Sequence, residues 1–347
     1  MNRRANDMRK NVNLLFLFLM LALAFVMVSC KKQLSPPYEI NGNKLYFGSY
    51  PQTKETNEEL ISKLNKMAGT KPTTDNCYNW IDYNYYSEGS MASFMFYQDI
   101  DYDKDGHYDY RGVYFTQYRP SDIENESAPN TSQQDNNGYF INEVYWFKYE
   151  KIEWDILFES EGEKLIIANL ILDSQYYYPS SSNHVFEHNG GEGYVNNYEL
   201  SYVRKFLNDD FYNTAFNKIQ KELIQVTELN NSDNAGVFAC NNTNDKIFLL
   251  SYSEAFEFYE NDESRKAHGT DYAIAQGLIV HYKEGNSPWI LRTPIDTNDG
   301  VESTIYGVSY IHGVCEDGSV TYTNGNNRIL INRNHNGLRP VCWVKVE

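Results

Sequence analysis

The sequence predicts an α+β fold made mainly of antiparallel strands with helices inserted between them. Short segments of alternating apolar and polar residues, separated by Gly, Asn and Pro turns, recur after residue 43 and indicate strands. Fewer segments carry apolar residues at helical spacing. Helices inserted among antiparallel strands are typical of α+β domains. A hydrophobic content of 41% and a charged content of 22% exclude a disordered or fibrous chain.

The amino terminus has the features of an export signal. Residues 1–10 are basic, and Leu14 to Val28 form an unbroken apolar run of fifteen residues. A helix that spans a bilayer needs about 20 residues, whereas the apolar part of a secretory signal is shorter. The run ends in Met27-Val28-Ser29-Cys30, which places a small residue directly before a cysteine.

This ending resembles the lipobox of bacterial lipoproteins, Leu-Ala-Gly/Ala-Cys, with Met27 in place of the leucine. The resemblance implies that residues 1–29 are a cleaved signal peptide and that Cys30 carries a diacylglycerol at the new amino terminus. Residues 30–44 would then be the lipidated start and tether. Each buried CH₂ contributes about 0.8 kcal/mol, so several acyl chains anchor the protein durably. An uncleaved amino-terminal anchor is the alternative. Both place residues 31–347 outside the cytoplasm, at the cell surface or on the periplasmic face.

The exported part of the chain is strongly acidic. The whole chain has a formal net charge of −17, and the first 29 residues contribute +3, four basic residues against Asp7. Their removal leaves −17 − 3 = −20. So acidic a chain argues against nucleic acid or anionic lipid as a partner of the folded part. The lipid bilayer is therefore expected as a partner only through the anchor.

The first elements follow the tether in order. Alternation predicts a strand at Asn43–Tyr50. Thr56, with Glu59 three residues later, predicts a capping box at the start of a helix that Gly69 ends. The segment Tyr78–Tyr118 is rich in Tyr and Phe and predicts strands and hairpins.

The next elements are strands and then helices. Alternation predicts strands at 143–149, 153–158 and 164–171, and Glu161-Gly162 turns the last two into a hairpin. Two helical stretches are predicted next. The first carries Val203, Phe206, Leu207 and Phe211 on one face, and the second carries Phe216, Ile219 and Leu223. Polar composition predicts surface loops at 121–138 and 179–197. The remaining expected elements are a strand at Lys246–Leu250, a helix begun by Ser253, and short strands after Gly277.

Six motifs occur in a fixed order along the body of the chain. They are Tyr46-Phe-Gly-Ser-Tyr-Pro-Gln-Thr53, Ile152-Glu-Trp-Asp-Ile-Leu157, Val203-Arg-Lys-Phe-Leu-Asn208, Asp245-Lys-Ile-Phe-Leu-Leu-Ser251, Trp289-Ile-Leu-Arg-Thr-Pro294 and Gly337-Leu-Arg-Pro-Val341. In this order they resemble a bacterial extracellular family, domain of unknown function 6273. The resemblance implies a single elaborated domain over residues 45–347 with an insertion at about 77–139. The resemblance implies an architecture and assigns no activity.

The closing motifs also resemble, more loosely, C-type-lectin-like folds of the formylglycine-generating-enzyme type. The resemblance implies that Arg292 and Arg339 are core arginines that pair with carboxylates and backbone carbonyls, with a ligand-contacting role as the alternative. In such folds the region before the closing strand borders the ligand face. The candidate ligand-binding residues are therefore Asn326, Asn327, Asn334 and His335.

Four cysteines remain after Cys30: Cys77, Cys240, Cys315 and Cys342. An even number outside the cytoplasm permits disulfides, with three full connectivities. The spacing contains no C-x-x-C and suggests neither a zinc knuckle nor a thioredoxin site. Cys315 and Cys342 lie in strand-like stretches near the carboxyl terminus and are the first pair to test. Four buried thiols are the alternative.

Two short motifs resemble metal sites. His184-Val-Phe-Glu187-His188 matches the H-x-x-E-H pattern of inverzincin peptidases, but the Ser and Gly residues around it favour a surface loop. Asp101-Tyr-Asp103-Lys-Asp105-Gly106 resembles the start of a calcium loop, with Asp109 at its ninth position. The twelfth position is Gly112 instead of a carboxylate, so an acidic hairpin turn is favoured over a calcium site.

Three functional hypotheses remain open. The leading one is a lectin-like domain that binds a glycan or protein ligand, because aromatic and amide side chains suit carbohydrate recognition; an AT-rich genome explains the same composition. The second is a structural or assembly role with an envelope or host protein. The third is an enzyme, either zinc-dependent through His184 and His188 or oxidative through cysteine. Nucleophile elbow, P-loop, dinucleotide and H-E-x-x-H motifs are absent, so no catalytic residue, cofactor or metal ligand is assigned.

The lipobox predicts the behaviour of a Cys30→Ser variant. Thiols ionise near pH 8.5 and alcohols do not, so serine is a much poorer nucleophile for lipid transfer. We expect the variant to remain an uncleaved, unlipidated precursor in the membrane fraction. Metabolic labelling with a fatty acid measures this, and label that still enters the variant would contradict it. Deletion of residues 1–30 should yield a soluble folded domain.

Overall fold

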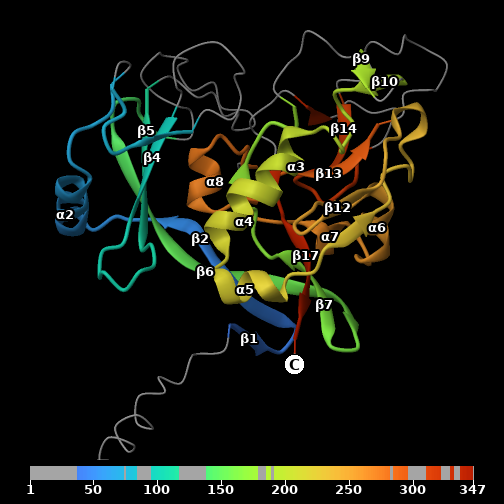
Figure 1. The fold of residues 1–347 in the computed structure, drawn as a ribbon, viewed down its shortest axis with the longest axis horizontal. Helices are drawn as coiled ribbons and strands as arrows, with labels where there is room; N and C mark the ends of the chain where they lie inside the picture. The colour runs from blue at the N-terminus through green and yellow to red at the C-terminus, as the bar shows by residue number, and fades with distance from the viewer. Residues whose placement is uncertain are drawn as a thin grey trace, which may run out of the picture. The chain divides into compact units, whose positions relative to one another are not determined.

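The computed structural model is organised around β6 (Val144–Ser160), the longest strand of its described part (Figure 1). The described residues are 37–73, 76–83, 95–116, 138–178, 185–188, 191–281, 284–295, 310–321, 329–331 and 337–346. One edge of β6 pairs along its length with β2 (Lys44–Lys54). Its other edge pairs with β5 (Tyr110–Phe115) in the first half and with β7 (Glu163–Ala168) in the second. The sheet therefore divides along one strand and curls.

The larger sheet contains eight described strands, and every pairing in it is antiparallel. Beyond β2 lies β1, beyond β5 lie β4 and β3, and beyond β7 lies β17. The bounds of these four strands are Tyr38–Asn41 for β1, Ile81–Asp82 for β3, Met95–Ile100 for β4 and Val341–Lys345 for β17. This arrangement confirms the predicted α+β class with mainly antiparallel strands.

A second sheet has five described strands in the order β15-β14-β13-β16-β8. Their bounds are Asp173–Ser174 for β8, Trp289–Pro294 for β13, Tyr310–Val314 for β14, Ile329–Leu330 for β15 and Gly337–Leu338 for β16. Two small hairpins complete the strands: β9 (Val185–His188) with β10 (Gly191–Tyr194), and β11 (Thr227–Leu229) with β12 (Thr243–Asp245).

Two pairs of strands pass side by side from one sheet to the other. Strand β7 continues into β8, and β16 continues into β17, while β7 pairs with β17 and β8 with β16. Arg339 lies at this crossing with 2% of its surface exposed. Its Nε donates to the carbonyl of Ala168 at 2.9 Å, and its guanidinium lies 4.9 Å from the ring centre of Trp289. Arg339 therefore holds the two sheets together, and its predicted core role is confirmed.

Short helices fill the space beside the sheets. Their bounds are Glu58–Ala68 for α2, Tyr202–Phe206 for α3, Tyr212–Ala215 for α4, Lys218–Leu223 for α5, Tyr252–Glu257 for α6, Asp262–Arg265 for α7 and Asp271–Ala275 for α8. Helices α3, α4 and α5 cross the face of the larger sheet (Figure 1). Phe216, which ends α4, packs on Phe47 of β2 and Trp154 of β6. No helix of the described residues is long and apolar enough to cross a membrane.

The bulge in β2 shows how sequence fixes the register of this sheet. The pairing with β6 shifts between Tyr46 and Ser49, where Gly48 takes φ +75° and a Cβ would lie 2.7 Å from the Phe216 ring. At this shift Trp154 Nε1 donates to the carbonyl of Phe47 at 2.7 Å. Glycine is therefore required at Gly48 both for its conformation and for space.

Several predicted boundaries were wrong. Strand β2 continues through Pro51 to Lys54, because the second register shift accommodates the proline. Asn57, and not Thr56, caps α2, although Gly69 ends it as predicted. Ser251, and not Ser253, begins α6 with Glu254 as its capping-box partner.

Three strand assignments also differed. The strands predicted at 143–149 and 153–158 form one strand, Val144–Ser160. Lys246–Leu250 is not a strand, since only Phe248 bridges to Val341 there. The loop predicted at 179–197 contains the β9–β10 hairpin. Short strands and one-turn helices of this kind depend on tertiary partners more than on local propensity. The loop predicted at 121–138 lies almost entirely outside the described residues.

The sheet crossing predicts the stability of an Arg339→Lys variant. Lysine keeps the charge but loses the Nε donor to Ala168 and the planar stack on Trp289. We expect the free energy of unfolding to fall by about 2–4 kcal/mol. Urea unfolding of the two proteins measures the difference. Lys345→Arg, on the exposed end of β17, is the matched control and should be neutral; equal effects would contradict the role of Arg339.

Candidate functional site

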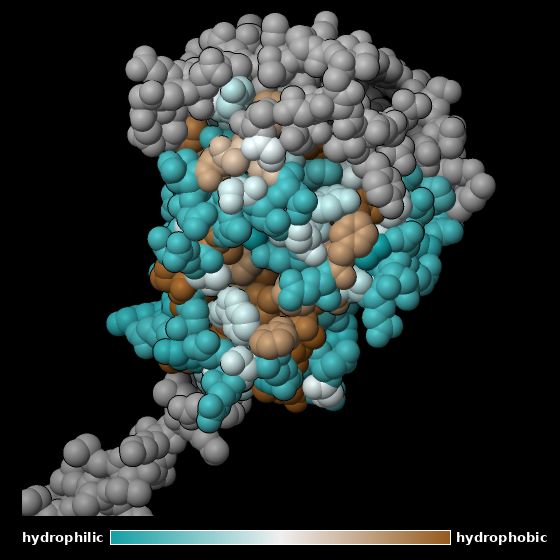
Figure 2. Space-filling model, turned by 90° about the vertical axis from the view of Figure 1, so that its right-hand side faces the viewer, coloured by the Kyte–Doolittle hydropathy of each residue, from teal (hydrophilic) through white to brown (hydrophobic). Residues whose placement is uncertain are grey.

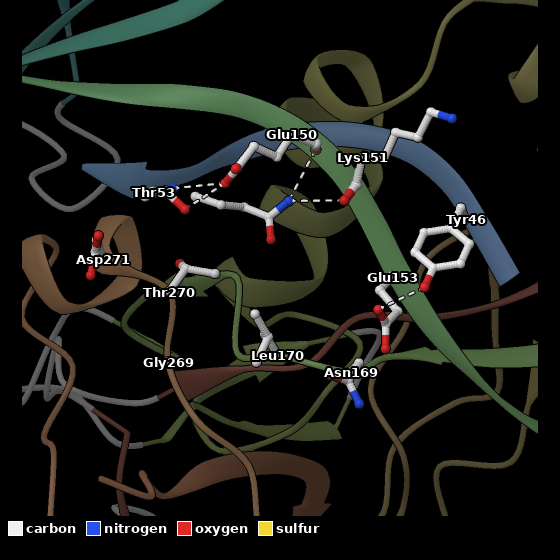
Figure 3. A pocket seen from close by; sticks show the side chains of 11 residues that line it. Tyr46, Thr53, Glu150, Lys151, Glu153, Asn169, Leu170, Gly269, Thr270 and Asp271 are labelled. Atoms are coloured by element: carbon white, nitrogen blue, oxygen red, sulfur yellow. Dashed lines mark hydrogen bonds between the residues drawn. The ribbon is translucent and has the colours of Figure 1, made fainter. Parts of the chain in front are cut away.

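A cavity of about 370 Å³ lies between strands β2 and β6 and the chain that leads into α8. We call it the β2/β6 pocket. Figure 3 shows the two strands on one side and residues 269–271 facing them across the space. The pocket is lined by Tyr46, Gln52, Thr53, Glu150, Lys151, Glu153, Asn169, Leu170, Gly269, Thr270 and Asp271.

Gln52 is fixed in this pocket by the irregular pairing of β2 and β6. Its Nε2 donates to the main-chain carbonyls of Glu150 and Lys151 at 3.0 and 3.2 Å. Only 8% of its surface is exposed. The described residues supply no donor to its Oε1. The amide oxygen of Gln52, Oε1, is therefore fixed in position and available as a hydrogen-bond acceptor.

Three further side chains present one free oxygen each. Glu150 Oε2 accepts from the Thr53 hydroxyl at 2.6 Å, and Asp271 Oδ2 accepts from the Lys54 amide at 2.8 Å. Asn169 uses its Nδ2 to donate to Asp155 at 3.1 Å. Among the described residues no donor reaches Glu150 Oε1, Asp271 Oδ1 or Asn169 Oδ1. Together with Gln52 the pocket offers four acceptors and suits a ligand rich in donors.

The pocket is acidic and carries one aromatic ring. Three carboxylates line it, from Glu150, Glu153 and Asp271, while the ammonium of Lys151 pairs with Glu39 and points away from the cavity (Figure 3). Tyr46 donates to Glu153 Oε2 at 3.0 Å, and this bond raises the pKa of the Tyr46 phenol (Figure 3). Neither His nor Cys is among the eleven lining residues. The lining thus offers hydrogen-bonding groups for the recognition of a ligand.

A strongly perturbed carboxylate lies elsewhere, in the core. Asp173 is 1% exposed and accepts from Tyr50 at 2.6 Å, Ser174 at 2.7 Å and Gln175 at 2.8 Å. Burial raises the pKa of Asp173 to about 6. Perturbed carboxylates often mark active sites, but none of these residues lines the β2/β6 pocket. The network therefore acts as an internal link between β2 and β8.

A second internal link involves Arg111 of β5. Its Nε and Nη2 each donate to Asp99 of β4 at 2.8 Å, and its guanidinium lies 4.4 Å from the Tyr97 ring centre. Its Nη1 donates to the hydroxyl of Tyr272 on α8 at 3.2 Å. This arginine thus joins the hairpin of the larger sheet to the helix that borders the pocket.

The acidic motif at 101–109 forms the turn between β4 and β5, as the hairpin interpretation predicted. Asp101, Asp103 and Asp109 bring one carboxylate oxygen each within 4.8 Å of the others, so they could hold a divalent cation. Backbone amides of the turn already donate to these carboxylates, among them Gly106 to Asp101 at 2.9 Å. Gly112, the twelfth position, pairs with Gln98 inside the ladder.

The predicted ligand and lipid residues are not tested by the structure. Cys30, Asn326, Asn327, Asn334 and His335 all lie outside the described residues. Arg292, by contrast, is buried as predicted. It forms a two-bond pair with Glu254 at 2.6 and 2.7 Å and donates to the carbonyl of Leu249 at 2.7 Å.

The suggested Cys315–Cys342 disulfide is not formed. Both cysteines are buried and free, as Cys77 and Cys240 are also free. Cys342 lies on β17 of the larger sheet, whereas Cys315 follows β14 of the smaller one. Burial raises the pKa of the Cys315 thiol to about 11, so it is not an activated nucleophile.

The H-x-x-E-H motif does not form a zincin helix. Residues Val185–His188 are strand β9 and pair with β10. A single helix is what places two such histidines on one face, so the pattern lacks the backbone that its zinc chemistry needs. His184 lies outside the described residues.

The residues of the β2/β6 pocket were not singled out from the sequence. Gln52 falls within the first of the six ordered motifs, which is the only signal that pointed to it. Asn169 and Asp271 lie about a hundred residues apart, and only the fold brings them to one cavity.

A family model described as Domain of unknown function (DUF6273) matches residues 161–346, slightly more than half of the chain. The match begins well after residue 45, where the resemblance was expected to begin. No curated protein and no solved structure matches the chain.

The buried Asp173 predicts a pH dependence of stability. Its folded pKa of about 6 lies above the ordinary value of 3.8, so the folded protein binds the extra proton between these values. Stability should therefore fall as pH rises from about 4 to about 6, by up to about 3 kcal/mol. We expect Asp173→Asn to lose this slope in urea unfolding across that range. Glu222→Gln, at an exposed carboxylate, should retain it; identical slopes for Asp173→Asn and the parent would contradict the assignment.

Proposed function

Since the chain belongs to the family described as a domain of unknown function (DUF6273), we propose its function from the site itself. The protein is a membrane-anchored extracytoplasmic lipoprotein whose folded domain binds a neutral glycan without catalysis. The β2/β6 pocket is the binding site. The observation that carries the proposal is the set of four acceptor oxygens beside the ring of Tyr46 to which no described residue donates.

Glycans match this pocket in chemistry and in charge. A sugar offers many hydroxyl donors, and the fixed oxygens of Gln52, Asn169, Glu150 and Asp271 are acceptors. The net charge of the lining disfavours an anionic polysaccharide, because like charges repel at short range. A volume of about 370 Å³ is within the range of small-ligand sites and accommodates one or two sugar units.

The remaining parts of the proposal rest on sequence and architecture. The lipobox at Met27–Cys30 supports the lipid anchor and the location outside the cytoplasm. The lectin-like part is supported by the mainly antiparallel α+β architecture and by the buried Arg292 and Arg339 of the closing motifs. Asn326, Asn327, Asn334 and His335 remain candidates for a second contact region of the same ligand.

Glycan binding by the full-length protein in detergent tests the proposal. We expect a neutral glycan to be retained from a broad array, with little dependence on salt. Asn169→Ala removes one free acceptor and should weaken binding about five- to thirtyfold, the equivalent of about 1–2 kcal/mol. Titration calorimetry with the retained glycan measures the change.

Asn244→Ala is the matched control, because it removes an exposed amide on β12 that is not part of the pocket lining. It should bind as the parent does. Absence of any neutral glycan across the array, or equal binding by the Asn169→Ala and parent proteins, would contradict the proposal.

A further inference from the structure

A second cavity, of about 400 Å³, lies between helix α6 and strands β7, β11 and β17. We call it the α6 pocket. All of its lining residues fall within residues 161–346, the part that the family model matches. They are Leu165, Thr227, Glu228, Leu229, Asn230, Asp233, Phe248, Ser251, Ser253, Glu254, Glu257, Phe258, Arg292 and Trp343. None of them lines the β2/β6 pocket, so the two cavities are separate sites.

The floor of the α6 pocket is apolar. Leu165, Leu229 and Phe248 are buried and line the cavity, while Phe258 and Trp343 are half-buried at its sides. The other four of the five tryptophans are buried, so Trp343 is the one whose ring a ligand reaches. Figure 2 views the side of the molecule that carries α6 and β7 and shows apolar residues gathered in the middle of this face, with hydrophilic ones around them. The pocket thus offers a dry surface to an apolar chain.

The charged residues around this floor are mostly acidic. Glu228, Asp233, Glu254 and Glu257 contribute −4 and Arg292 contributes +1, a net of −3. Arg292 is already neutralised, because it forms its two-bond pair with Glu254. Among the described residues no basic side chain pairs with the other three carboxylates.

Glu257 occupies a position where a carboxylate lowers the stability of the helix. It is the last residue of α6, where the helix dipole places partial negative charge and favours cations. It is exposed and makes no ion pair with a described residue. The carboxylates do not converge as metal ligands, since the described residues bring three such groups together only at Asp101, Asp103 and Asp109. The α6 pocket therefore suits a cation larger than a metal ion.

We infer that the α6 pocket binds a small organic cation, a protonated amine carried on an apolar chain. The chain packs on Leu229 and on the ring of Trp343, which excludes water from both. The ammonium lies among Glu228, Asp233 and Glu257, where charge interactions hold it. The net charge of −20 expected for the exported chain adds a long-range attraction for cations.

Three probes of equal length separate charge from apolar contact: hexylammonium, 1-hexanol and hexanoate. Trp343 is the one half-buried tryptophan, so emission and its quenching by acrylamide report on this pocket in the full-length protein. We expect hexylammonium to protect the emission in a saturable way that weakens as salt is added. Hexanol and hexanoate should have little effect, and the hexanoate arm also tests Arg292 as an anion site.

Two matched variants locate the charge effect. Glu257→Gln removes one carboxylate of the pocket and should weaken hexylammonium binding about fivefold. Glu260→Gln removes an exposed carboxylate outside the lining and should leave binding unchanged. Thermal melting checks that both variants fold.

The inference is overturned by equal binding of hexanol and hexylammonium, by binding of hexanoate alone, or by an absence of saturable protection. It is also overturned if Glu260→Gln weakens binding as much as Glu257→Gln, because the attraction would then come from the charge of the whole chain. Glycan binding at the β2/β6 pocket is measured separately, and neither result depends on the other.

Discussion

The crossing of two strand pairs at Arg339 is the constraint on which the rest of the structure depends. Strands β7 and β17 belong to the larger sheet, and β8 and β16 belong to the smaller one. The segments β7–β8 and β16–β17 each pass directly from one sheet to the other. A buried guanidinium lacks hydration and must find acceptors within the protein. Arg339 finds them in the carbonyl of Ala168 and, at 3.6 Å, in the carboxylate of Asp155. The two sheets are therefore joined at this crossing instead of packing as independent layers.

The long strand β6 transmits this constraint to the β2/β6 pocket. Its second half carries Asp155 and pairs with β7, while its first half pairs with β5. Between these halves, Glu150, Lys151 and Glu153 face the β2/β6 pocket, where no third strand covers them (Figure 3). The shifts of register in β2 then place Gln52 against free carbonyls of β6. The pocket is thus a consequence of a sheet that divides along one strand.

Buried charges of this protein stabilise specific junctions. Arg111, Arg292 and Arg339 each join elements distant in sequence, through Asp99 and Tyr272, Glu254, and Asp155 respectively. Such pairs offset the cost of desolvation only when the geometry is close and further hydrogen bonds satisfy the remaining donors. Arg292 keeps one buried donor, Nε, without a partner among the described residues. The carboxylates at the two pockets differ, because several of their oxygens have no partner among the described residues. These oxygens line cavities that a ligand can reach, so they are available for binding.

The sequence by itself determined the fold class, the family and the core role of the two closing arginines, and the export signal stays a prediction from sequence. These follow from local patterns, such as alternation, capping residues and ordered motifs, that need no long-range contact. Gly69, Gly162 and Arg292 were each assigned correctly for that reason. Only the tertiary structure decided the sites. Gln52, Asn169 and Asp271 meet in one cavity, and Trp343 meets Glu257 in another, because the fold brings together segments that lie more than eighty residues apart in the sequence. The spacing of residues along the chain does not show which distant segments come together. Neither pocket could therefore be predicted before the fold was known.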